Sequence, residues 1–206
     1  MRSGKKSRRH IGWLMSWPIA MLIGLMAPTS PARAQAVAAT EDWVAKLAGL
    51  ETAPDDVEVA ALRQQALAKV KSKADGVPLK RPPVVPQLLK LPKFAVEIQF
   101  DEDSSIIRPE SYRTLGRIAD TLSNPALLSY KFLIVGHTVA TGRRENNLTL
   151  SQRRADAIRD ALVTTFKISP KRLQGVGLGE EQLLDAAHPT APINQSCEIA
   201  TVGKAL

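Results

Sequence analysis

The stretch from Ile134 to Ile158, IVGHTVATGRRENNLTLSQRRADAI, decides the fold, because it passes from a strand through a loop into a helix. The apolar run 132–135 ends at Gly136 and is typical of a strand buried on both faces. Gly136 and Gly142 bound the loop, so we expect its backbone to turn tightly and approach a ligand closely. Residues that then recur every three or four positions predict a helix with one shared side: Asn147, Leu150, Ser151, Arg154 and Ile158. This spacing places Arg154 back beneath the loop.

The loop and helix together contain a spaced motif. The loop has Gly136-His137-Thr138, and the helix has Asn147, Leu150-Ser151 and Arg154-Ala155. This motif resembles that of the OmpA-like peptidoglycan-binding domain, in which a G-H-T-D loop precedes N-x-x-L-S-x-x-R-A on a helix. The likeness extends over residues 94–203, about half of the chain.

The resemblance implies both a fold and a ligand. The fold is α/β: a two-layer βαβαββ sandwich with helices on one face of a mixed four-stranded sheet, preceded by a short helical segment. In the family, the arginine equivalent to Arg154 holds the carboxylate of diaminopimelate in the wall peptide, and the loop aspartate holds its ammonium group. A planar guanidinium can grip a carboxylate through two charge-assisted hydrogen bonds. We expect four further residues in the peptidoglycan site: Asn147, Thr138, Asp101 and Ser151.

Two positions depart from the family pattern. Val139 stands where the family has aspartate, and valine cannot pair with an ammonium group. The family's terminal N-R-R-V is Asn194-Gln195-Ser196-Cys197 here, which lacks both arginines. Removing one partner of a desolvated charge pair costs about 2–5 kcal/mol, so we expect weakened affinity. A replacement carboxylate would have to come from elsewhere, and Asp101 or Asp103 is the nearest candidate.

The N-terminus has the pattern of a secretory signal peptide over residues 1–34. Basic residues between Lys5 and Arg9 precede an apolar run, and Ala32-Arg33-Ala34 supplies a small-x-small cleavage site. We expect cleavage near Ala34 and a mature chain in the periplasm, associated with peptidoglycan or the outer membrane. The competing interpretation is a retained anchor, which would make the protein a membrane-to-wall tether.

Residues 35–77 are predicted to form a helical accessory segment. Thr40 is a candidate cap for a helix that presents Trp43, Leu47 and Leu50. Asp55 and Glu58 suit a capping box before a second helix with four apolar residues on one side: Val59, Leu62, Ala66 and Val70. These apolar sides need a partner, which is the downstream domain, each other or another envelope protein.

A proline-rich linker, residues 78–93, separates this segment from the domain at 94–206. Its five prolines disfavour helix, so the linker acts as a stiff spacer unless it packs down. Within the domain we expect a half-buried strand from Phe94 to Phe100. A helix should begin at Pro109 and bury Tyr112, Leu115, Ile118, Ala119 and Leu122. Further strands are expected at 173–178 and 198–202.

Charge and motif chemistry argue against several other functions. Residues 1–34 hold six of the 28 basic residues and no acidic one, and the chain from Phe94 onward has 13 of each sign. We therefore expect no nucleic-acid partner. Glu180 and Glu181 follow the glycine-rich run 175–179, where they would repel a bound pyrophosphate. Ser151 lacks a nucleophile elbow, and the histidines lack metal-ligand spacing, so we expect no enzyme, cofactor or metal.

The single cysteine, Cys197, excludes an internal disulfide. An intermolecular bridge and a half-buried strand residue are the alternatives. The sequence as a whole favours binding over catalysis. The main hypothesis is non-covalent binding of the diaminopimelate-containing stem peptide of peptidoglycan. The alternative is a degenerate OmpA-like domain that acts as an envelope scaffold through residues 35–77.

Overall fold

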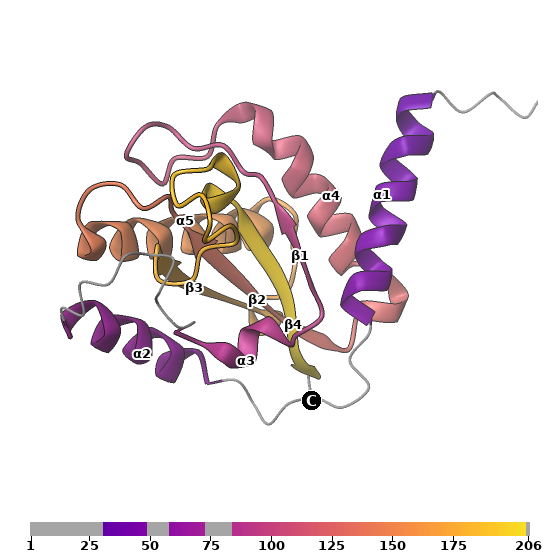
Figure 1. Cartoon of the computed structure of the whole chain (residues 1–206). Coiled ribbons are helices and arrows are strands. Elements are labelled where there is room, and N and C mark those ends of the chain that lie inside the picture. Colours follow the sequence, from indigo (N-terminus) through magenta and orange to yellow (C-terminus); the bar gives the residue numbers. More distant parts are fainter. Residues whose placement is uncertain (1–30, 49–57, 73–83, 205–206) are drawn as a thin grey trace, which may run out of the picture.

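The computed structural model describes residues 31–48, 58–72 and 84–204 (Figure 1). Leu50 and Asp55 lie outside these ranges, as do the predicted signal sequence up to residue 30 and the linker residues 78–83. None of the helices in the described ranges is long and apolar enough to cross a membrane.

Four strands form one mixed sheet: Lys93–Val96 (β1), Tyr130–His137 (β2), Leu173–Gly179 (β3) and Cys197–Lys204 (β4). Their order across the sheet is β1-β4-β2-β3. β2 is parallel to β3, and β4 is antiparallel to β1 and β2. The predicted βαβαββ order and mixed four-stranded sheet are therefore confirmed.

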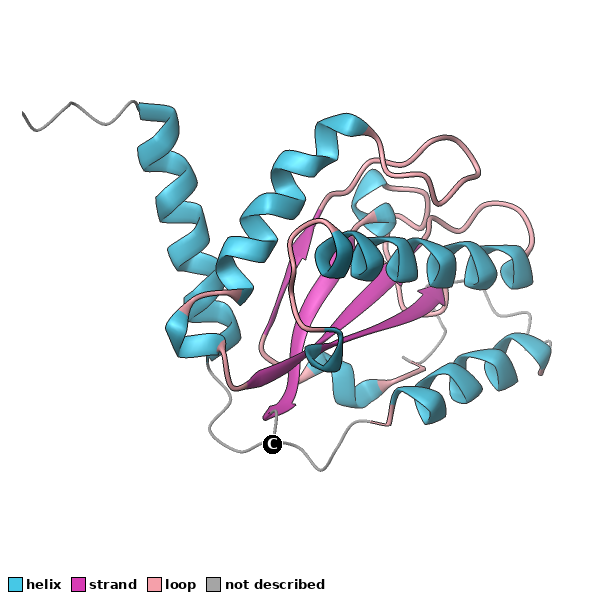
Figure 2. Ribbon diagram, turned by 180° about the vertical axis from the view of Figure 1, so that it is seen from behind, coloured by secondary structure: helices cyan, strands magenta, loops and turns pink. Residues whose placement is uncertain are grey.

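Two helices cover one face of the sheet, as Figure 2 shows from behind: Tyr112–Leu122 (α4) and Arg144–Thr164 (α5). Their buried side chains join those of the strands in one apolar core, with Phe132 and Ile134 of β2 at its centre. Both helices were predicted on this face. Tyr112, predicted to be buried, is 42% exposed, because it lies in the first turn where the short 3₁₀ turn Pro109–Ser111 leads into α4.

The opposite face of the sheet is also covered, which the expected two-layer arrangement did not include. Helices Val59–Lys71 (α2) and Pro86–Leu89 (α3) lie against it (Figure 1). Val59, Leu62, Ala66 and Val70 are buried there as predicted, together with Val85 and Leu88 and the strand residues that face them. Residues 84–92 therefore pack down and do not act as an extended spacer.

The first helix, Pro31–Ala48 (α1), packs beside α4 and the edge strand β1 (Figure 1). Trp43 stacks on Phe94 with ring centroids 4.5 Å apart, and Leu47 is fully buried in the same core. Thr40 lies within this helix, so its predicted role as the cap is wrong. The apolar side of α1 is thus occupied by the domain that follows it.

Two other local predictions need correction. Glu58 was expected in the first turn of the second helix, as the partner of a capping box. It stands at the N-cap position of α2 and makes no side-chain cap hydrogen bond. The half-buried strand from Phe94 to Phe100 is shorter than expected, because regular pairing with β4 ends at Val96. Beyond it, Ile98 is buried, and Phe100 forms an isolated bridge with Ile107.

Glycines allow α5 to lie directly on the sheet. A Cβ atom added to Gly177 of β3 would lie 2.1 Å from the backbone nitrogen of Gln152, and one on Gly136 would lie 2.4 Å from the carbonyl oxygen of Ser151. Gly136 therefore serves helix packing, whereas the sequence suggested that it lets the loop approach a ligand. Gly142 does have the backbone conformation that favours glycine, with φ +75°.

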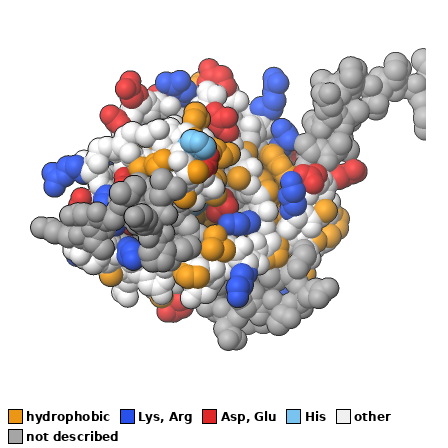
Figure 3. Space-filling view, in the orientation of Figure 1, with side chains coloured by type: hydrophobic (Ala, Val, Ile, Leu, Met, Phe, Trp, Pro, Cys, Tyr) orange, Lys and Arg blue, Asp and Glu red, His pale blue; other side chains and the backbone are white. Residues whose placement is uncertain are grey.

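Charged side chains of both signs are interspersed over the face seen in Figure 3. This distribution agrees with the balanced charge of the domain and gives that face no single-sign field. Cys197 lies in β4 as expected, but it is only 2% exposed and so is buried more completely than the half-buried residue that the sequence suggested, which disfavours an intermolecular disulfide.

Candidate functional site

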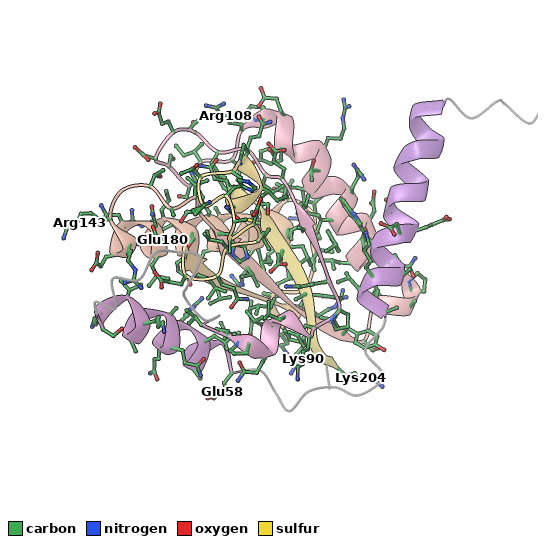
Figure 4. The ribbon with its side chains drawn as sticks, viewed as in Figure 1. Glu58, Lys90, Arg108, Arg143, Glu180 and Lys204 are labelled. Atoms are coloured by element: carbon green, nitrogen blue, oxygen red, sulfur yellow. The ribbon has the colours of Figure 1, made fainter. Side chains whose placement is uncertain are left out.

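A polar cavity of about 400 Å³ opens at the end of the sheet where β2 runs into its loop. The strand β4 runs antiparallel to β2, so its last residue, Lys204, lies at the opposite end of the sheet. Figure 4 shows Arg108, a lining residue, far from Lys204. Twelve residues line the cavity: Phe100, Asp101, Glu102, Asp103, Arg108, Thr138, Val139, Thr141, Asn147, Leu150, Arg154 and Gln195.

Arg154 is the fixed cation of this cavity. Its side chain leaves the third turn of α5 and is 7% exposed. The guanidinium lies 4.8 Å from the centre of the Phe100 ring, and its Nε donates a 2.9 Å hydrogen bond to the carbonyl oxygen of Ser104. Within the described residues its two terminal NH₂ groups donate to no acceptor. They remain available to an anionic group.

Burial lowers the pKa of Arg154 from its ordinary value, while Cys197 and Asp103 act in the opposite direction. A guanidinium starts from so high a pKa that it stays protonated. The burial that lowers this pKa leaves the side chain 7% exposed, so the charge has lost much of its hydration. An incoming carboxylate would therefore meet a partly desolvated cation, with which pairing is stronger than at an open surface.

Acidic residues stand in the loop that faces Arg154. Asp101 accepts a 3.1 Å hydrogen bond from Nε of Arg108, so part of its charge is already balanced. Asp103 adopts φ +48° at the tip of this loop, and its carboxylate accepts no hydrogen bond from any described residue. Asp103 is close enough to Arg154 to affect its pKa. Of the two carboxylates suggested by the sequence, Asp103 is thus the one that accepts no hydrogen bond from a described residue.

The loop after β2 contributes one polar and one apolar side chain. Thr138 is 2% exposed, and its hydroxyl is buried without a hydrogen-bond partner among the described residues. Its backbone nitrogen donates to the carbonyl oxygen of Gly179, which fixes the start of the loop to β3. Val139 lies in the lining and offers only hydrocarbon at the family's aspartate position. A buried hydroxyl without a partner normally costs free energy, so a ligand that bonds to it would recover that cost.

Asn147 organises the loop from its place in the first turn of α5. Its amide nitrogen donates to the carbonyl oxygen of Thr141 at 2.6 Å and to the Glu180 carboxylate at 2.7 Å. A longer contact of 3.4 Å reaches the carbonyl oxygen of Val139. The side chain borders the cavity, but its amide nitrogen already donates hydrogen bonds to other residues of the protein. Asn147 therefore acts mainly by holding the loop in place.

Ser151 does not line the cavity, although the sequence placed it in the site. Its hydroxyl donates to the carbonyl oxygen of Leu148 and accepts a 2.8 Å hydrogen bond from the backbone nitrogen of Gly179. Ser151 is fully buried against β3. These contacts fasten α5 to the sheet.

A buried cluster of ionisable side chains lies beside the strand that leads into the loop. His137, Glu198 and Lys93 come from β2, β4 and β1; the Glu198 carboxylate is 2.8 Å from the lysine ammonium and 3.4 Å from Nε2 of the histidine. Burial by itself raises the pKa of Glu198, but the histidine and the lysine outweigh it, so this pKa lies below the ordinary value. The cluster joins three strands immediately before Thr138.

The altered terminal motif also has a structural explanation. Asn194 is fully buried and ties the preceding loop through three hydrogen bonds, with the backbone of Asp185 and with the carbonyl oxygen of His188. Gln195 lines the cavity, whereas Ser196 is buried and donates to the carbonyl oxygen of Ile193. Only one of the two missing arginine positions therefore faces the cavity.

Four of the five predicted site residues thus meet at one cavity, namely Arg154, Asn147, Thr138 and Asp101. Sequence reasoning did not place Phe100 beneath the arginine, nor Leu150 and Gln195 in the lining. Gln195 could have been found from its position in the terminal motif. The Phe100 contact depends on how the loop folds back, for which the sequence carries no signal.

The site is thus a cavity of an α/β domain with a partly desolvated cation, a facing carboxylate and a threonine whose buried hydroxyl has no partner among the described residues. The sequence model of the OmpA family matches residues 99–195, which include every one of these groups. The chain therefore contains a domain of the OmpA family.

Curated relatives share this part of the chain. The peptidoglycan-associated lipoprotein of Mesorhizobium japonicum is 40% identical over 85 residues, which cover 41% of this chain and 49% of the lipoprotein. Outer membrane porin F of Pseudomonas aeruginosa is 31% identical over 97 residues, 47% of this chain and 27% of the porin. The chain thus spans about half of the first relative and about a quarter of the second. The domain is homologous to the corresponding part of each.

A solved structure gives a further match. The peptidoglycan-associated lipoprotein from Burkholderia pseudomallei is 30% identical, with a TM-score of 0.41; the match covers 61% of this chain and 98% of that one.

Proposed function

We propose that this protein binds peptidoglycan non-covalently, through the diaminopimelate-containing stem peptide, and catalyses no reaction on it. The observation that supports this most is the buried guanidinium of Arg154, which lines the cavity and whose terminal NH₂ groups have no acceptor among the described residues. Homology to the lipoproteins, whose name states that they associate with peptidoglycan, supports the same ligand.

In this proposal the two charges of the ligand's amino-acid centre meet opposite charges in the cavity. Arg154 pairs with the carboxylate through its terminal NH₂ groups, and the hydroxyl of Thr138 adds a hydrogen bond. Asp103 takes the ammonium group, in place of the aspartate that Val139 replaces. Asp103 is exposed, so water screens this pair and we expect a lower affinity than with a buried aspartate at position 139.

Location and domain organisation form part of the same proposal. Residues 1–34 act as a signal peptide, residues 35–93 as an accessory segment with its linker, and residues 94–206 as the wall-binding domain in the periplasm. Homology to an outer membrane porin and to peptidoglycan-associated lipoproteins supports an envelope location. Trp43 and Leu47 of α1 and the buried residues of α2 pack on the domain, so within the described part of residues 35–77 an additional envelope partner would use the outer sides of these helices.

Co-sedimentation of the purified protein with insoluble peptidoglycan sacculi tests the proposal. We expect the parent to sediment with sacculi and Arg154→Ala to remain in solution, because the ligand carboxylate then lacks its partner. Arg153→Ala is the matched control, since its side chain is the exposed neighbour on the same helix. Equal sedimentation of the parent and Arg154→Ala would refute the proposed role of the arginine.

The variant Val139→Asp separates a weakened site from a degenerate one. Restoring the family's aspartate should strengthen binding by about tenfold, equivalent to about 1.4 kcal/mol. If the parent does not bind but Val139→Asp does, the domain is a scaffold whose ligand site has degenerated. The valine in the lining is the observation that favours this second function.

A further inference from the structure

A second cavity, of about 290 Å³, lies between α1, α4 and the edge strand β1. It has none of the lining residues of the Arg154 cavity. Eight residues line it: Trp43, Val96, Glu97, Gln99, Glu110, Ser111, Thr114 and Arg117. Its volume is at the lower limit of ligand-binding pockets, which suits a small molecule or the end of a peptide chain.

Arg117 is the cation of this second cavity. Its guanidinium carbon lies 4.5 Å from the centre of the Trp43 ring, and that ring stacks in turn on Phe94. The Trp43 ring of α1 therefore contacts both the guanidinium and Phe94 of β1. The tryptophan face also stabilises the positive charge.

The guanidinium of Arg117 has no acidic partner in the part of the chain that the structure describes. Its Nε is buried and donates to no acceptor among the described residues, none of whose carboxylates lies within ion-pair distance of it. A buried charged donor without an acceptor costs free energy, so such groups in folded proteins call for an explanation. Because Nε is enclosed by the protein, a ligand carboxylate would pair with the terminal nitrogens of Arg117.

The other polar groups of this cavity restrict the charge of a ligand. Glu97 and Glu110 are exposed carboxylates in the lining. They would repel a doubly charged anion such as phosphate, but they can pair with an ammonium group. A molecule with one carboxylate and one ammonium group matches this set of charges.

The geometry points to a second binding site in this cavity, for an amino acid or a short peptide whose two ends are both unblocked. The ligand carboxylate pairs with Arg117 beside Trp43, and the ligand ammonium group lies at Glu97 or Glu110. This site is independent of the Arg154 cavity and does not rest on peptidoglycan binding.

Trp43 provides a direct readout. The full chain has three tryptophans, so Trp13→Phe and Trp17→Phe leave Trp43 as the sole one. This protein is titrated with alanine, the dipeptide alanyl-alanine, alaninamide and inorganic phosphate to about 10 mM, because few-contact ligands bind in the millimolar range. We expect a saturable fluorescence change with alanine if the ligand is a free amino acid, or with the dipeptide alone if it is a peptide end. Alaninamide, which lacks the carboxylate, and phosphate should give none.

Variants identify the residues responsible. Arg117→Gln should lower the affinity at least about tenfold, since it removes a charge-assisted pair. Glu110→Gln leaves the stack on Trp43 intact and checks the ammonium contact if the arginine variant folds poorly. Arg113→Gln, an exposed arginine of the same helix, and Arg154→Ala should bind like the parent. The inference is overturned if neither alanine nor the dipeptide changes the fluorescence, if alaninamide binds equally well, or if a folded Arg117→Gln variant retains full affinity.

Discussion

At the scale of single residues, the binding capacity of the Arg154 cavity depends on which polar groups already bond to other described residues and which do not. Asp101 is paired with Arg108, and Asn147 holds the loop, whereas the Asp103 carboxylate and the terminal NH₂ groups of Arg154 bond to no described residue. Sequence motifs identify the residue types, but they do not show which side chains already bond to other residues of the protein. Ser151, which fits the motif perfectly, is used to fasten a helix.

Asp103→Asn should weaken binding to sacculi by about tenfold, equivalent to about 1.4 kcal/mol. The physical reason is the loss of the charge that meets the ligand ammonium group. Asp101→Asn should have a smaller effect, because that carboxylate already pairs with Arg108. Sedimentation at a series of sacculus concentrations measures both, with the exposed Asp120→Asn on α4 as control. An unchanged affinity in Asp103→Asn would remove it as the substitute for the family's aspartate.

Glu198 should make folding stability depend on pH. Its pKa is lower in the folded protein than its ordinary value of 4.5, so its stabilisation is present above about pH 4.5 and is lost as the pH falls through the folded pKa. Glu198→Gln should be less stable than the parent at pH 7 by about 1–3 kcal/mol, because Lys93 loses its partner. The difference should shrink below pH 4.5. Urea unfolding at several pH values measures it, and a constant difference down to pH 3 would contradict this role.

At the scale of elements, the sequence predicts the βαβαββ order well, because hydrophobic periodicity and turn residues are local signals. It fails where a residue's role depends on a distant partner. Thr40 has the chemistry of a cap yet lies inside α1, which packs on α4 and β1. Pro86 marks the start of the short helix α3 and not an extended spacer, because Val85 and Leu88 can be buried on the sheet.

The packing of α5 on β3 gives a prediction about glycine. Gly177→Ala should destabilise the protein by about 3 kcal/mol, because the new methyl group would lie 2.1 Å from the backbone of Gln152 and force the helix away. Gly142→Ala should cost only about 1 kcal/mol, since its side chain would enter open space and the penalty is the positive φ alone. Chemical unfolding compares the two. Equal losses would show that helix contact does not explain the glycine of β3.

At the scale of the whole molecule, both faces of the sheet are covered, one by α4 and α5 and the other by α2 and α3 (Figures 1 and 2). The main cavity lies at one end of the sheet, where loops and the N-terminal half of α5 line it. The helices that precede the OmpA-family domain thus complete its core and do not line the Arg154 cavity. The sequence predicted their apolar sides but could not choose the partner, since any apolar surface would satisfy the same pattern.

The most direct test of the central claim is calorimetric titration of the protein with a soluble stem peptide that contains diaminopimelate. We predict saturable binding by the parent that is lost in Arg154→Ala, retained in Arg153→Ala and strengthened in Val139→Asp. Absence of binding by both the parent and Val139→Asp, with both proteins folded, would contradict the assignment of the Arg154 cavity as a peptidoglycan site.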